Sequence, residues 1–91
     1  MRTIELSDIC TAYLEGYVYA KITESLITGQ IKSSYLDALK KIAVESVKNY
    51  IEHSDFSFDQ KEYMKKNYEH WVDITLHGIK QRLRDIGKLY E

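Results

Sequence analysis

The chain contains no proline and only four glycines in 91 residues. Proline ends helices and glycine weakens them, so a chain almost free of both offers few points at which a helix must stop. Its apolar residues, 44% of the total, recur at the spacings of three and four that a helix requires. The sequence therefore predicts an all-α fold in one domain, residues 1–91, with no room for a second core.

Three helices are predicted, joined by short loops into an up-down-up bundle. The first runs from about Thr3 or Ser7 to Thr28, and Gly29 closes it in the left-handed conformation that glycine tolerates. Apolar side chains cover well over half of its circumference: Ile9, Cys10, Tyr13, Leu14, Tyr17, Val18, Ala20, Ile22 and Leu26. One antiparallel neighbour cannot bury so wide an arc. We expect this helix to lie between the other two, or to be covered by another copy of the chain or a partner.

The second predicted helix begins after Ser33 and Ser34 and ends near His53. Ser34 and Asp37 approximate a capping box, in which two side chains satisfy free backbone N–H groups at the helix start. Its apolar stripe comprises Leu36, Leu39, Ala43, Val47 and Tyr50, flanked by Tyr35, Ile42 and Ile51. Such a stripe is typical of a helix that buries one side.

The third predicted helix begins at Phe58, because Ser57 and Gln60 match the Ser-x-x-Gln form of the capping box. The apolar period does not reset at Gly78, which favours one long continuous helix. The stripe comprises Tyr68, Val72, Thr75, Ile79, Leu83, Ile86 and Tyr90. Gly78 is then interpreted as a small residue that lets a neighbouring helix approach closely.

Charge and cysteine content exclude several classes of protein. The chain has 13 Lys and Arg against 14 Asp and Glu, and this near-neutral balance makes nucleic acid an improbable partner. The basic end of the third helix, Lys80, Arg82, Arg84 and Lys88, is diluted by Asp85 and Glu91. A single thiol, Cys10, excludes an intramolecular disulfide and a cysteine-based zinc site.

The apolar segments are too interrupted for export or membrane insertion. Glu5 and Asp8 break the start of the chain where a secretory signal would need an apolar core, and Lys21 and Glu24 break the most hydrophobic segment. We therefore expect a cytoplasmic protein with no membrane partner.

A candidate ligand site lies on the first helix. Tyr13, Tyr17 and Lys21 are spaced four apart on one line, and Glu24 follows three residues on. The tyrosines could stack on a planar ligand such as a base while the lysine meets a phosphate or carboxylate. In the other interpretation, the tyrosines are core or interface residues, and Lys21 reaches solvent or pairs with Glu24.

A group of polar residues on the third helix has the spacing of possible metal ligands. His70, Asp73 and His77 lie three and four apart beside Glu69, so neighbouring side chains share a helix face. His70 and His77 meet only through Asp73, and a protein site would need ligands from elsewhere. A solvated polar face is the default interpretation, and no metal or cofactor is expected.

The stretch His77-Gly-Ile-Lys80, followed by Ile86-Gly87, resembles the phosphorylatable segment of histidine phosphotransfer domains. The resemblance implies that His77 is the nucleophile and that Lys80 neutralises the phosphoryl group. It covers about 11 residues. Gln81 stands where that family usually has a small residue, and the further long helix of that family has no counterpart here.

No catalytic constellation stands out, so the favoured function is non-catalytic. The sequence predicts a binding or regulatory protein, an inhibitor or sequestering module of the small type carried by phages and mobile elements, which acts through a tyrosine-rich helical surface. We expect a homo-oligomer with a protein partner. Two alternatives remain: an oligomeric sponge that binds a small anionic, nucleotide-like ligand at Tyr13, Tyr17, Lys21 and Glu24, and histidine phosphotransfer at His77.

Overall fold

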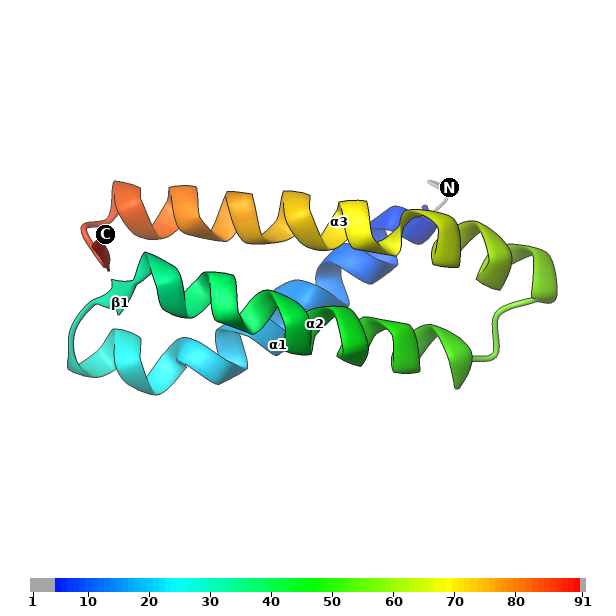
Figure 1. Cartoon of the computed structure of the whole chain (residues 1–91), viewed down its shortest axis with the longest axis horizontal. Coiled ribbons are helices and arrows are strands. Elements are labelled where there is room, and N and C mark those ends of the chain that lie inside the picture. Colours follow the sequence, from blue (N-terminus) through cyan, green and yellow to red (C-terminus); the bar gives the residue numbers. More distant parts are fainter. Residues whose placement is uncertain (1–4, 91) are drawn as a thin grey trace, which may run out of the picture.

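The computed structural model describes residues 5–90. They form the helices α1 (Leu6–Thr28), α2 (Ser33–Glu52) and α3 (Phe58–Asp85) and two short strands, β1 (Ile31–Lys32) and β2 (Leu89–Tyr90). Figure 1 shows α2 and α3 side by side along the length of the molecule, with α1 crossing them obliquely. All three helices pack against one another around one core, which confirms the all-α prediction.

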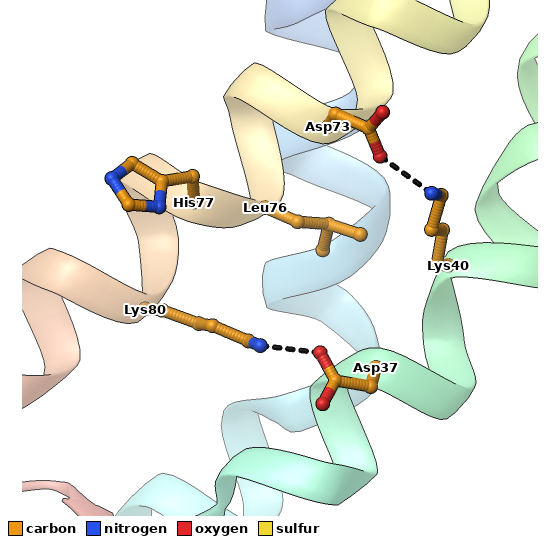
Figure 2. Close-up of a pocket in the computed structure, with 6 residues that line it drawn as sticks. All are labelled: Asp37, Lys40, Asp73, Leu76, His77 and Lys80. Carbon is orange, nitrogen blue, oxygen red and sulfur yellow. Dashed lines mark hydrogen bonds and ion pairs between the residues drawn. The ribbon is translucent and has the colours of Figure 1, made fainter.

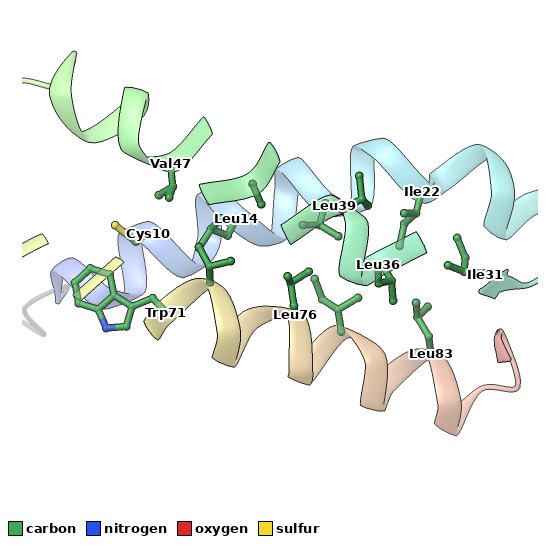
Figure 3. Packing of buried hydrophobic residues seen from close by; sticks show 14 of the residues in the cluster. Cys10, Leu14, Ile22, Ile31, Leu36, Leu39, Val47, Trp71, Leu76 and Leu83 are labelled. Atoms are coloured by element: carbon green, nitrogen blue, oxygen red, sulfur yellow. The ribbon is translucent and has the colours of Figure 1, made fainter. Parts of the chain in front are cut away.

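Each helix contributes a stripe of side chains to this core (Figure 3). On α1 the buried residues are Cys10, Leu14, Val18 and Ile22, one at every fourth position. The rest of the wide apolar arc is not enclosed: Ile9, Tyr13 and Tyr17 are half-buried, and Ala20 is exposed. α2 and α3 therefore cover only part of the arc within this chain. The alternative start of α1 at Thr3 lies outside the described residues.

The predicted stripe of α2 is largely correct. Leu36, Leu39, Ala43 and Val47 are buried, but Ile51 rather than Tyr50 completes the stripe, and Tyr35 and Ile42 are exposed.

The predicted cap of α2 is wrong. The helix already includes Ser33 and Ser34, its N-cap is Lys32, and no side chain bonds there. Asp37 pairs instead with Lys80 on α3. The reason is that β1 leads directly into α2, so strand pairing holds the entering backbone.

The start of α3 at Phe58 is confirmed. The backbone N–H of Gln60 donates to Ser57 Oγ at 3.2 Å, and the backbone N–H of Ser57 donates to Gln60 Oε1 at 2.9 Å, which completes the capping box. The helix continues through Gly78, also as predicted. The close approach of another helix at Gly78 is wrong, because the nearest atom to an added Cβ would be Nη2 of Arg82 at 3.9 Å.

The predicted continuation of α3 as far as Tyr90 is wrong. The helix ends at Asp85, and Gly87 adopts a left-handed φ of 72°. The N–H of Lys88 donates to the carbonyl of Leu83 at 2.8 Å, and that of Gly87 to Arg84 at 3.1 Å, the pattern of a Schellman motif. This motif turns the chain out of the helix.

The turned chain forms a parallel strand pair that the periodicity did not indicate. β1 and β2 align Ile31 with Leu89 and Lys32 with Tyr90. Just before β2, the carbonyl of Lys88 accepts from the N–H of Ile31 at 2.7 Å. Two segments far apart in sequence are thereby joined at one end of the bundle.

The helix end at Gly29 differs from its prediction. α1 does end there, but Gly29 has a φ of 172°, which is extended rather than left-handed.

Within residues 5–90, no helix is both long enough and apolar enough to cross a membrane.

Alanine substitutions at two glycines are expected to change stability in opposite directions. Gly87→Ala should lower the free energy of unfolding by about 1–2 kcal/mol, because its left-handed φ strains any residue with a Cβ. Gly16→Ala should raise it by about 0.5–1 kcal/mol, because Gly16 lies inside α1 and an added Cβ meets open space. Urea unfolding of both variants measures the difference, and two changes of the same sign would contradict the assigned backbone conformations.

Candidate functional site

Tyr13 and Tyr17 belong to an aromatic row that joins α1 to α2 and the segment after it. The row consists of Tyr17, Tyr13, Tyr50 and Phe56. Tyr13 and Tyr50 are stacked with centroids 4.4 Å apart and an interplanar angle of 11°. The centroid of the Tyr17 ring lies 6.4 Å from that of Tyr13, and the two rings are near-parallel, with an interplanar angle of 18°. Phe56 meets Tyr50 edge-on at 6.4 Å.

The hydroxyl of Tyr13 fixes the row to α2. It shares a 2.5 Å hydrogen bond with Ser46 Oγ. Stacking and this bond together hold Tyr13 against α2, so the ring face that stacks on Tyr50 is not open to a planar ligand. Spacing along α1 gave no sign of Ser46, Tyr50 or Phe56, because these partners are more than 30 residues away in sequence.

Lys21 and Glu24 lie beside the row without contacting each other through an ion pair. The Nζ of Lys21 is 5.5 Å from the centroid of the Tyr17 ring, a cation–π distance. Both side chains are exposed. Neither takes part in any of the ion pairs formed within residues 5–90. By their spacing the four predicted site residues lie on one side of α1, and Lys21 reaches solvent across Tyr17.

α2 extends this surface with exposed apolar side chains. Ile42 precedes Ser46 by one helical turn and Tyr35 precedes Ile42 by two turns, so they lie on the flank of α2 that faces Tyr13. Ile42 is 51% exposed and Tyr35 is 44% exposed. We call Tyr13, Tyr17, Lys21, Glu24, Tyr35 and Ile42 the tyrosine-rich surface. Its charged members are one lysine and one glutamate.

A second surface, between α2 and α3, is charged. Figure 2 shows two ion pairs across this seam, Lys80 with Asp37 and Lys40 with Asp73, on either side of Leu76. The Lys40–Asp73 pair is 2.7 Å long. With His77 these residues line a pocket of about 220 Å³, which we call the charged groove.

The lysines and aspartates of the charged groove pair with one another. The hydrogen bond and the charge of Asp73 raise the pKa of Lys40, and the nearby carboxylates of Glu69 and Asp37 act in the same direction. A neighbouring hollow of about 350 Å³ adds Lys41, Val44, Glu45 and Glu69 to the lining.

These contacts separate the side chains of the polar group formed by His70, Asp73 and His77. Asp73 points across the seam to Lys40, whereas His77 points away from the Lys80–Asp37 pair (Figure 2). Residues 5–90 contain no group of three or more potential ligands placed to hold a metal ion. Lys80, which the phosphotransfer resemblance assigns to His77, contacts Asp37 instead.

Cys10 and Arg82, the remaining reactive and charged candidates, are also held by contacts within the fold. Cys10 is fully buried, and burial raises the pKa of its thiol to about 11, so it stays protonated near neutral pH. Arg82 bonds to Glu15 at 2.9 Å and lies over the Tyr19 ring. The hydrogen bond to Glu15 is the main cause of the raised pKa of Arg82. These contacts join α3 to α1.

Comparison with family models, curated proteins and solved structures gave no match to this chain.

Proposed function

We propose that this chain is a non-catalytic binding protein, an inhibitor or sequestering module that engages a protein partner through the tyrosine-rich surface. The observation that carries this proposal is the exposure of Ile42 and Tyr35 beside a fixed row of tyrosines, with only Lys21 and Glu24 as charges. Protein interfaces are enriched in aromatic residues and depleted of charge at their centre, and tyrosine is frequent among the residues that dominate binding.

The fixed geometry of the tyrosines supports a protein partner. Ordering a side chain at an interface costs about 0.5–1.5 kcal/mol, and a side chain already held in place loses less freedom on binding. Tyr13 is held by Tyr50 and by Ser46 before any partner arrives. A flat ligand would need a free ring face there, whereas a protein can contact the ring edges and the neighbouring Ile42.

The two surfaces also differ in whether their side chains already have partners within the described part of the chain. In the charged groove, Lys40 and Lys80 each have an acidic partner within the chain. On the tyrosine-rich surface, the exposed apolar area of Ile42 and Tyr35 is not covered by other side chains of residues 5–90. Burial of apolar area is the dominant favourable term in most protein–protein association.

Site-specific photo-crosslinking tests this function. A photoreactive amino acid at Ile42 should give a discrete crosslinked protein species in cells, whereas the same amino acid at Glu62, exposed on α3, should not. Tyr17→Ala should reduce the Ile42 product at least about tenfold, the loss expected for a tyrosine that contributes 1.4 kcal/mol or more.

Equal crosslinking from Ile42 and Glu62, or an Ile42 product unaffected by Tyr17→Ala, would contradict the proposed surface. Circular dichroism of each variant provides the control for folding. Tyr17 is suited to this test because its ring lies at the end of the aromatic row, so its loss leaves the Tyr13–Tyr50 stack in place.

A further inference from the structure

α1 carries a second, outward seam besides its buried stripe. Tyr13, Tyr17, Ala20, Glu24 and Ile27 follow one another at spacings of four, three, four and three. This is the spacing with which one helix packs along another. The last three are exposed, and Ile27 is the most exposed large apolar residue described, at 78%. The C-terminal half of the seam thus has no partner among residues 5–90.

The charges beside this seam are complementary in a two-fold arrangement. Lys21 and Glu24 are three residues apart and carry opposite charges. If two α1 helices lie antiparallel about an axis between residues 22 and 23, Lys21 of one copy and Glu24 of the other stand at the same height. Symmetry then produces this pairing twice.

Glu24 also stands near an end of α1 where a positive charge would be favourable. It lies close to the C-terminal end of α1, where the helix dipole is negative, and no basic residue occupies the last turn. Lys21 does not pair with it within the chain. An ammonium group from a second α1 would compensate both the carboxylate and the helix end.

From this seam and its charges we infer that the tyrosine-rich surface binds a second copy of the chain. The two α1 helices pack antiparallel, and Lys21 of each copy pairs with Glu24 of the other. In this register Ile27 comes within one turn of Ala20 of the other copy, whose small side chain leaves room for it. The inference rests on the proposed function, because it names the partner of the same surface.

Charge reversal distinguishes this pairing from any contact within one chain. Lys21→Glu leaves two carboxylates on each copy, and Glu24→Lys leaves two ammonium groups, so each variant should repel itself and raise the dimer Kd at least about tenfold. When the two variants are mixed, both pairs become complementary again. Native mass spectrometry should therefore show two monomeric variants that form a heterodimer when mixed.

The doubly reversed variant, with both Lys21→Glu and Glu24→Lys, should dimerise like the original chain. Lys66→Glu and Glu62→Lys change the net charge equally but lie on exposed positions of α3, and they should leave the dimer unchanged. Circular dichroism of every variant controls for folding. A monomeric original chain, single variants that dimerise normally, or a mixture that forms no heterodimer would overturn the inference.

Failure of this inference is distinguishable from failure of the proposed function. If Ile42 crosslinks to a different protein and the charge reversals leave self-association unchanged, the binding function stands and the second copy is wrong. If charge reversal controls a dimer but Ile42 gives no product, the dimer stands and the wider surface on α2 is wrong.

Discussion

Ile79→Ala is expected to lower the free energy of unfolding by about 2–5 kcal/mol, the range for a buried isoleucine truncated to alanine. Ile79 is 0% exposed in the C-terminal third of α3, where it belongs to the core shared by all three helices. For a domain of this size each kcal/mol shifts Tm by about 4–8 °C, so thermal unfolding should show a drop of more than about 8 °C.

The matched control is Ile74→Ala on the same helix. Ile74 is 54% exposed, so the same atoms are removed with little loss of packing, and alanine has the higher helix propensity. We expect a change within about 0.5 kcal/mol. Similar losses at both positions would show that α3 is rotated relative to its described orientation.

Tyr13→Ala is expected to cost about 2–3 kcal/mol of unfolding free energy, somewhat less than full truncation of a buried aromatic residue because Tyr13 is half-buried. The variant removes the ring stacked on Tyr50 and the hydroxyl bonded to Ser46. Tyr13→Phe keeps the ring and should cost only about 0.5–1.5 kcal/mol, the value of the hydrogen bond. Denaturant unfolding of both variants separates stacking from hydrogen bonding.

Tyr35→Ala serves as the control for the Tyr13 series. Tyr35 is an exposed tyrosine on α2 without a described ring partner in the row, and its loss should change stability within about 0.5 kcal/mol. If Tyr13→Ala proved no more destabilising than Tyr35→Ala, the aromatic row would not stabilise the contact between α1 and α2.

The aromatic row gives the tyrosine-rich surface two roles at once. Tyr13 packs α1 against α2, and the adjoining Tyr17, Ile42 and Tyr35 are offered to a partner. Loss of binding in a Tyr13 variant would therefore combine unfolding with loss of contact. Tyr17 and Ile42 are the positions at which the proposed binding can be tested with the fold intact.

Local signals in the sequence were sufficient to locate the three helices, but not the cap of α2 or the end of α3. The side chains of Ser57 and Gln60 bond to each other's backbone within four residues, so the start of α3 could be predicted without knowledge of the rest of the fold. The unbroken apolar period through Gly78 likewise reports which face of one helix is buried. These features depend on neighbours within one or two turns.

Contacts between distant segments required the tertiary structure. The stacking of Tyr13 on Tyr50 and the pairing of Asp37 with Lys80 join residues on different helices, whose relative rotation is set by core packing. Gly87 could have continued a helix or turned the chain, and its left-handed turn leads to hydrogen bonding with the segment after α1. Local periodicity thus predicts where the three helices lie and part of each buried stripe. Tyr50, Ile86 and Tyr90, which the period also assigned to stripes, are half-buried or exposed. Which polar and aromatic side chains meet follows from the tertiary structure, because these pairings depend on how the buried stripes of the three helices pack together.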